Sequence, residues 1–198
     1  MIPVDRNKDI EKDINSAVRV LRDGGVILYP TDTVWGIGCD ATDEKAVRRI
    51  YALKRRDDHK ALITLVDSEE MLARTVSNIP AAAYDMMHET EFPLTIVYDQ
   101  GTGVADSLKG DDGTIGVRIT REYISSEICR RLGHPLVSTS ANISGEPAAR
   151  CFSEISREVL DNVDYICTSR RDETVDDVPR PSSVVRICAD NSFKILRK

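Results

Sequence analysis

The sequence has no long apolar run, and this absence excludes a membrane-spanning helix, which needs roughly 20 consecutive apolar residues. The first nine residues (MIPVDRNKD) are already polar and acidic, so the apolar core of a signal peptide is missing as well. Five cysteines occur at wide intervals without a CxxC pair or a CxH spacing, which excludes the usual zinc sites. We therefore expect a cytoplasmic protein that does not bind a membrane, with reduced, mostly buried thiols and no metal ligands.

Standard signatures of nucleotide and hydrolase sites are missing too. No Walker, GxGxxG, HExxH, GxSxG or kinase pattern is present, so a nucleotide site in this chain would be of another kind. Ser138 and Ser140 have no local base, and a hydroxyl without a base is usually a hydrogen-bonding group. We interpret both serines as binding residues. The formal net charge of -6 argues against wrapping nucleic acid by bulk charge, so any RNA contact would be a local basic patch.

The pattern of apolar residues predicts interleaved helices and strands. With 198 residues, no internal repeat and no long flexible linker, the chain is expected to form one domain, residues 1–198. Helical spacing and end signals predict helices near 10–22, 43–54, 80–88, 121–132 and 153–161, with a further helix beginning at Ser68. Strands are expected at 26–29, 61–66, 94–98, 114–119, 136–139, 164–167, 183–187 and 193–196.

Two of these strands run directly into polar residues. The apolar run 26–28 leads into Pro30-Thr-Asp-Thr33, and the run 136–137 leads into a segment with Ser138, Thr139, Ser140 and Asn142. Polar strand ends are places where ligands tend to bind. Either segment alone fits an ordinary turn, but the two together indicate a polar crevice.

A basic cluster follows the second predicted helix: Lys54, Arg55, Arg56, His59 and Lys60. Cations placed there can converge on phosphates, or they can simply offset a helix dipole in solvent. Arg118 and Arg197 also lie at strand ends and could add charge to the same crevice. The polar loop 169–180 is open to two interpretations, a mobile flap or a solvated connection.

These segments together resemble the YrdC/YciO-type family of L-threonylcarbamoyl-adenylate synthases, and the resemblance covers nearly the whole chain. Seven markers occur in the family's order: Tyr29–Gly38 (YPTDTVWGIG), Lys54–Arg56 (KRR), Pro93–Thr95 (PLT), Gly116–Arg118 (GVR), Ser138–Pro147 (STSANISGEP), Ser182–Val185 (SSVV) and Ile195–Arg197 (ILR).

The resemblance implies an α/β, single-domain YrdC-like (DHBP synthase-like) fold, with a twisted mixed sheet, flanking helices and a large open cavity. It implies a nucleotidyltransferase that joins L-threonine, bicarbonate or CO2, and ATP, and releases pyrophosphate. Mg2+ would be bound through the nucleotide phosphates. The product would serve threonylcarbamoyl modification of the tRNA adenosine beside the anticodon. This implies a downstream tRNA-threonylcarbamoyl transferase complex and leaves contact with tRNA or double-stranded RNA open.

The resemblance also implies roles for individual residues. Lys54 and Arg56 would be catalytic. Threonine would be bound by Thr33, Ser138 and Ser183, with Ser182 the close competitor of Ser183. The nucleotide side would be formed by Arg56, Lys60, Arg118, Ser140, Asn142 and Arg197, and no residue is implied as a metal ligand.

The chain departs from the family pattern at several positions expected to touch the substrate pocket. Arg55 replaces a common Gly, Ala61 a common Pro and Arg186 a common Asp, while Leu65 stands where many members have a histidine near threonine. These departures are similar to the YciO-like branch. Two hypotheses therefore remain: a synthase, or an RNA-binding or ribosome-associated module with the same cavity and weak or no synthase activity. Threonine-dependent release of pyrophosphate distinguishes them.

Overall fold

A computed structural model describes residues 4–56, 62–174 and 181–198 of the chain. The α-helices are α1 (Val4–Arg22), α2 (Glu44–Leu53), α3 (Glu69–Thr75), α4 (Ala81–Glu89), α5 (Tyr123–Leu132) and α6 (Arg157–Leu160). The strands are β1 (Ile27–Tyr29), β2 (Gly36–Gly38), β3 (Ile63–Val66), β4 (Leu94–Tyr98), β5 (Ile115–Ile119), β6 (Leu136–Ser140), β7 (Tyr165–Ile166), β8 (Ser183–Ile187) and β9 (Phe193–Arg197). Short 3-10 turns are η1 (Asp106–Leu108) and η2 (Phe152–Glu154).

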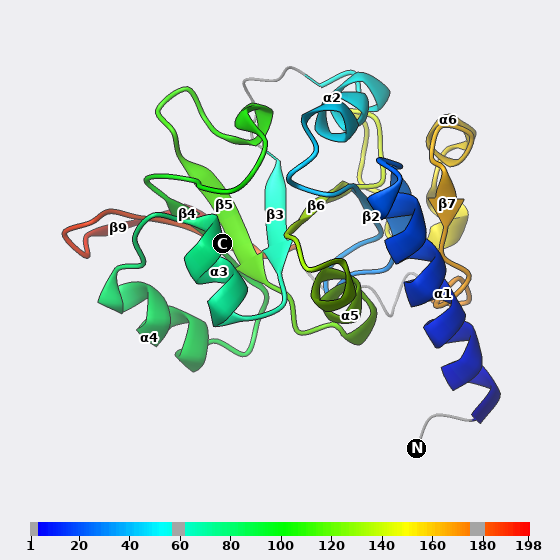
Figure 1. Ribbon diagram of the computed structural model, residues 1–198, viewed down its shortest axis with the longest axis horizontal. Helices are drawn as coiled ribbons and strands as arrows, with labels where there is room; N and C mark the ends of the chain where they lie inside the picture. Colours follow the sequence, from blue (N-terminus) through cyan, green and yellow to red (C-terminus); the bar gives the residue numbers. More distant parts are fainter. Residues whose placement is uncertain (1–3, 57–61, 175–180) are drawn as a thin grey trace.

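Within the described residues the strands form a nine-stranded sheet in the order β7-β1-β2-β6-β3-β5-β4-β8-β9. The pairs β1–β7, β3–β5 and β4–β8 are parallel, and the other neighbouring pairs are antiparallel. Figure 1 shows α3, α4 and α5 on the near face of this sheet, with β7 and β9 at its opposite ends. The predicted α/β fold with a mixed sheet and flanking helices is confirmed.

Local signals explain where the helices begin and end. Asp43 caps α2 by accepting hydrogen bonds from the amides of Lys45 and Ala46, and Ser68 caps α3 through Met71. At the other end of a helix, Gly133 stops α5 in the left-handed conformation (φ 79°), which glycine adopts without strain. Gly133 lies between α5 and β6, the strand that carries Ser138 and Ser140.

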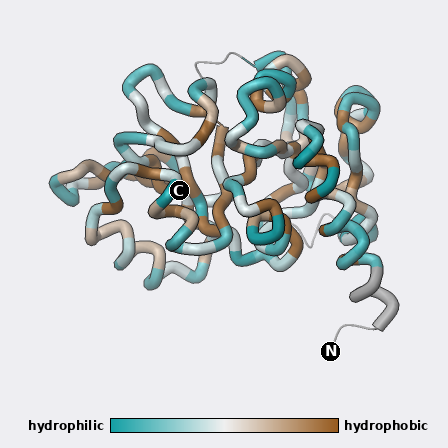
Figure 2. The backbone as a smooth tube through the Cα atoms, viewed as in Figure 1, coloured by the Kyte–Doolittle hydropathy of each residue, from teal (hydrophilic) through white to brown (hydrophobic). Residues whose placement is uncertain are grey.

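The hydrophobic core lies between the sheet and the helices. Ile14 and Leu21 of α1 and Val47 and Ile50 of α2 are fully or almost fully buried, as their helical spacing predicts. Figure 2 shows apolar residues, in brown, along the central strands. All five cysteines are free and four of them are buried, which confirms the prediction of buried thiols. No helix of the described segments has the length and apolarity needed to cross a membrane.

The structure differs from the sequence prediction at α1, which begins at Val4 and not near residue 10, at strand β2 and at residues 153–161. Strand β2 was not predicted, because Gly36 and Gly38 give it no β-branched or aromatic signature. The structure explains this composition, since a Cβ at Gly38 would lie 2.5 Å from the Val137 carbonyl oxygen and 2.7 Å from the Tyr29 ring. The single helix predicted at 153–161 is instead η2 followed by α6, because Ser156 caps a new helix through Val159.

Candidate active-site cavity

A cavity of about 410 Å3 collects polar residues from segments far apart in the sequence. Six of the predicted site residues line it: Thr33, Arg56, Arg118, Ser138, Ser140 and Arg197. Other lining residues include Thr95, Gly116, Thr139 and Ser182. Alternation along β5 explains part of this arrangement, because Gly116 and Arg118 reach the cavity while Ile115 and Val117 pack into the core.

Thr33 is held by a turn that follows β1. The Thr31 hydroxyl donates to the Val34 carbonyl oxygen at 2.7 Å and accepts the Thr33 amide at 3.0 Å. The Thr31 and Thr33 hydroxyl oxygens are 3.1 Å apart. Thr33 is 7% exposed and Thr31 2%, so the turn is rigidly packed with only one of its two hydroxyls on the cavity wall.

Arg118 forms a buried cationic part of the wall. It is 3% exposed, and its guanidinium lies 3.0 Å from the Asp32 carboxylate. Burial lowers the pKa of Arg118, while the negative charge of Asp32 opposes that shift. Its Nε has no hydrogen-bond partner among the described residues. A buried donor without a partner carries a substantial desolvation cost, so this position favours a ligand with an acceptor oxygen.

Ser182, and not Ser183, lies on the cavity wall. The Ser182 hydroxyl is 2.9 Å from that of Thr95, and the Arg197 guanidinium donates two hydrogen bonds to the Ser182 carbonyl oxygen at 2.9 and 3.0 Å. Ser183 instead pairs with β4, where its amide donates to Pro93. Adjacent residues of an extended chain face opposite ways, so the choice between two serines could not be made from the sequence. The PLT marker was the available signal for Thr95.

Lys54 does not line the cavity, although the sequence predicted a catalytic role. The side chain is 1% exposed, and its ammonium group donates to the carbonyl oxygens of Ser140 and Asn142 at 2.5 and 2.6 Å. Burial lowers the pKa of Lys54 to about 8, with a further contribution from the positive charge of Arg56. In this position Lys54 anchors the turn after β6 on which Ser140 sits.

Asn142 also shapes this turn and is not among the lining residues. Its side-chain oxygen accepts the Ser140 hydroxyl at 2.5 Å, and its amide nitrogen donates to the Glu146 carbonyl oxygen at 2.7 Å. Hydrogen bonds from Lys54 therefore connect the Lys54–Arg56 segment with the turn that contains Ser140 and Asn142. Lys60, the remaining predicted nucleotide residue, lies outside the described residues, as does Ala61.

The other departures from the family pattern lie away from the cavity wall. Leu65 is fully buried, and the Arg186 guanidinium lies 3.3 Å from Asp112 and 3.6 Å from Asp99. Neither lines this cavity. Arg55 adopts the left-handed conformation (φ 49°), which accounts for the glycine common there in the family, and its side chain forms an ion pair with Glu158 at 2.6 Å.

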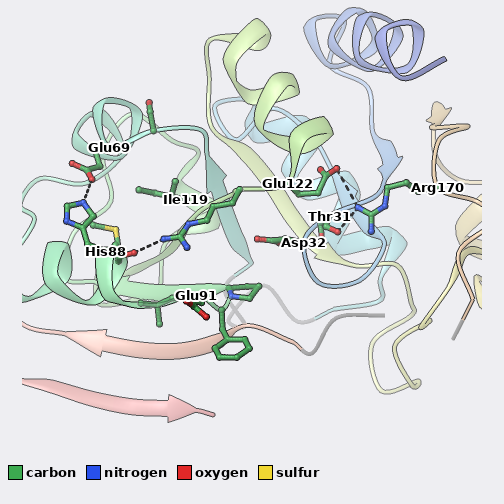
Figure 3. A pocket seen from close by; sticks show the side chains of 14 residues that line it. Thr31, Asp32, Glu69, His88, Glu91, Ile119, Glu122 and Arg170 are labelled. Carbon is green, nitrogen blue, oxygen red and sulfur yellow. Dashed lines mark hydrogen bonds and ion pairs between the residues drawn. The ribbon is translucent and has the colours of Figure 1, made fainter. Parts of the chain in front are cut away.

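A second cavity, of about 580 Å3, lies on the other side of Asp32 (Figure 3). Its lining includes apolar Phe92, Pro93 and Leu94 beside His88 and Glu69, which form a 2.7 Å hydrogen bond. Thr31 and Asp32 of the polar segment after β1 line it, but none of the residues given a substrate-binding role from the sequence does so within the part of the chain that the structure describes. The two cavities meet at the Asp32–Arg118 ion pair, because Asp32 lines one and Arg118 the other. Each cavity is large enough to hold a small substrate.

Comparison with known proteins finds relatives that match most of the chain. A threonylcarbamoyl-AMP synthase of Idiomarina loihiensis is 33% identical over 173 residues, which cover 86% of this chain and 91% of the relative. A protein of the same name from Pseudomonas aeruginosa is 37% identical over 151 residues, covering 76% of this chain and 81% of that one.

Solved structures agree with this placement. P. abyssi Sua5 in complex with L-threonine matches with a TM-score of 0.78 at 27% identity, covering 88% of this chain and 50% of Sua5. E. coli YciO matches with a TM-score of 0.77 at 26% identity, covering 93% of this chain and 88% of YciO. The model of the Sua5/YciO/YrdC family, described as telomere recombination, matches residues 19–198. The chain belongs to the Sua5/YciO/YrdC family.

Proposed function

We propose that this protein is an L-threonylcarbamoyl-AMP synthase, a nucleotidyltransferase that uses L-threonine, bicarbonate or CO2, and ATP. The observation that carries the proposal is a single cavity in which the buried Arg118, with a donor that finds no partner among the described residues, lies beside hydroxyls and two further arginines. Relatives named for this activity and a threonine-bound structural neighbour support the same assignment.

The reaction has two bond-forming steps. The neutral amine of threonine adds to CO2 and, after losing a proton, gives a carbamate. A carbamate oxygen then attacks the α-phosphorus of ATP, the bond from that phosphorus to the bridging oxygen breaks, and pyrophosphate leaves. This chemistry requires no covalent enzyme nucleophile, because positioning and charge neutralisation dominate phosphoryl-type transfer.

The wall residues suit the two substrates in different ways. We assign Arg118 to the threonine carboxylate and not to the nucleotide side that the resemblance implied, because its Nε has no acceptor among the described residues. Thr33, Ser138 and Ser182 lie around the amino acid in this assignment. Arg56, Ser140 and Arg197 are assigned to ATP, because guanidinium groups make strong charge-assisted hydrogen bonds to phosphate. Lys60 belongs to the same assignment from the sequence pattern. Magnesium enters as part of the MgATP substrate, bound to its phosphates.

The product is assigned to tRNA modification beside the anticodon. We place the reaction in the cytoplasm and expect a tRNA-threonylcarbamoyl transferase complex to consume the adenylate. The mixed anhydride between the carbamate and AMP is a reactive acyl donor, which is consistent with its transfer to an adenosine amine.

The test is release of pyrophosphate by the pure protein. We expect release only when ATP, bicarbonate and threonine are all present, with formation of an adenylate of the corresponding mass. Threonine-independent hydrolysis of ATP, or no turnover together with tight binding of structured RNA, would contradict the assignment and favour the RNA-binding alternative.

A further inference from the structure

Two residues outside the predicted site form hydrogen bonds within the turn that carries Thr33. Thr31 is nearly fully buried and does not line the 410 Å3 cavity, yet its hydroxyl makes three contacts within the turn. Arg170 lies 139 residues further along the chain and donates to the Thr31 carbonyl oxygen at 3.1 Å. Figure 3 shows Arg170 beside Thr31 and Glu122, at the end of the second cavity that lies away from His88 and Glu69.

The direction of the hydrogen bonds in this turn follows from donor counting. A threonine hydroxyl has one proton and two acceptor sites. The proton of Thr31 goes to the Val34 carbonyl oxygen, because a carbonyl can only accept. The contact between the two hydroxyl oxygens must therefore be donated by Thr33. This leaves the Thr33 oxygen as a hydrogen-bond acceptor toward the cavity.

A strap after β7 fixes the position of Arg170. The buried carboxylate of Asp13 accepts hydrogen bonds from the amides of Thr168 and Ser169 at 2.9 and 2.6 Å and from both of their hydroxyls. Burial alone would raise the pKa of Asp13, but hydrogen bonds from the Ser169 and Tyr165 hydroxyls and from the amides of Thr168 and Ser169 lower it. The Asp13 carboxylate therefore stays charged and, as a hydrogen-bond acceptor, holds residues 168–169 in place.

Arg170 itself is held on both sides. It has φ 62°, a left-handed conformation that is strained for a non-glycine residue, and its guanidinium pairs with Glu173 and lies 3.5 Å from Glu122. A strained arginine kept in place by two acids and a buried anchor has a defined donor direction, which ends at the Thr31 carbonyl.

We infer that Thr31 and Arg170 are positioning residues that set the Thr33 hydroxyl as an acceptor for an N–H or O–H donor of the substrate. Threonine carries such donors on its amine and its side chain, whereas its carboxylate would be repelled by an acceptor. The inference rests on the proposed function for the identity of the ligand. The inference that these hydrogen bonds hold the turn in one conformation rests only on the geometry.

The decisive experiment measures L-threonine and ATP binding by calorimetry, together with amide exchange at Thr33. Thr31→Val keeps the shape and removes the hydroxyl, so we expect threonine affinity to fall about tenfold, ATP affinity to stay within about twofold, and the Thr33 amide to exchange faster. Thr31→Ser should restore all three. Arg170→Gly tolerates the backbone conformation and removes the donor, and should weaken threonine binding about threefold.

Arg171→Ala is the matched control. Its guanidinium donates to Cys167 and Ile166 of the same strap and stacks 4.6 Å from the Phe152 ring, without touching Thr31. Wild-type threonine affinity and unchanged Thr33 exchange in Thr31→Val would overturn the inference. Failure of the unmodified protein to bind threonine would instead contradict the proposed ligand, while the exchange data would still decide whether the turn is locked.

Discussion

The cavity is bounded by two turns that are held in different ways. The turn after β1 is held by Arg170, which is 27% exposed in its side chain and paired with acids. The turn after β6 is held by Lys54, which is 1% exposed and donates to carbonyl oxygens. In both cases the cation lies behind the turn and a hydroxyl-bearing residue faces the cavity.

The two turns differ in how many hydrogen bonds each loses when its cation is removed. Arg170 shares its charge with Glu173 and Glu122, so its loss removes one hydrogen bond from a turn that Thr31 also stabilises. Lys54 satisfies two buried carbonyl oxygens, and unpaired buried acceptors are costly. The turn after β6 should therefore fail as a unit, whereas the turn after β1 should loosen by degrees.

Replacing the buried lysine should give the largest effect. We expect Lys54→Met to lower the free energy of unfolding by about 2–4 kcal/mol, because two buried carbonyl oxygens lose their donor. Chemical denaturation measures this change. Lys45→Met is the control on the exposed part of the same helix and should shift stability by less than about 0.5 kcal/mol. Equal changes in the free energy of unfolding for the two variants would show that the turn after β6 does not depend on Lys54.

Arg56→Ala tests which substrate binds on the side of the cavity nearest to Lys54. ATP binding should weaken by roughly 1.5–3 kcal/mol through loss of a charge-assisted hydrogen bond, while threonine binding is retained. Calorimetric titrations with each substrate measure the two terms separately. An unchanged affinity for ATP would show that Arg56 does not contact the nucleotide and is an ordinary solvated residue at the end of a helix.

The titration of Lys54 gives a pH test. Its folded pKa is about 8 against an ordinary value of 10.5, so between these values the unfolded chain keeps a proton that the folded protein releases. Raising the pH through this window should increase the contribution of Lys54 to the free energy of unfolding. The same deprotonation weakens the hydrogen bonds to the turn, so ATP affinity should fall as the pH rises through about 8.

Stability and affinity measured over this range should therefore move in opposite directions. Both changes should be absent in Lys54→Met. A step in ATP affinity that persists in that variant would assign the titration to another group.

The smallest effect is expected at Arg55, the second arginine with a positive φ near the cavity. Its surface pair with Glu158 is worth little, so Arg55→Gly should raise the free energy of unfolding by roughly 0.5 kcal/mol as backbone strain is relieved. Glu158→Gln measures the ion pair alone. Arg170→Gly provides the contrast, since the same relief of strain there accompanies a loss of threonine affinity.

Much of this arrangement could be predicted from the sequence. Strands β4 and β8 lie where the apolar pattern predicted them, and the polar residues after β1 and at the end of β6 do meet in one cavity. These predictions succeed because hydrophobic periodicity and strand ends are local signals.

Other features depend on contacts that no local pattern contains. Lys54 and Arg56 look alike in the sequence, yet one is buried behind a turn and the other lines the cavity. Ser182 and Ser183 differ only by which face of the chain they occupy. The role of Arg170 depends on a left-handed backbone residue and on a carboxylate more than 150 residues earlier in the chain.

A crystal structure with bound L-threonine would locate the amino acid directly. We expect threonine in the 410 Å3 cavity, with its carboxylate on the Arg118 guanidinium and an N–H or O–H donor directed at the Thr33 hydroxyl oxygen. Threonine bound instead in the 580 Å3 cavity beside Phe92 and His88 would contradict it.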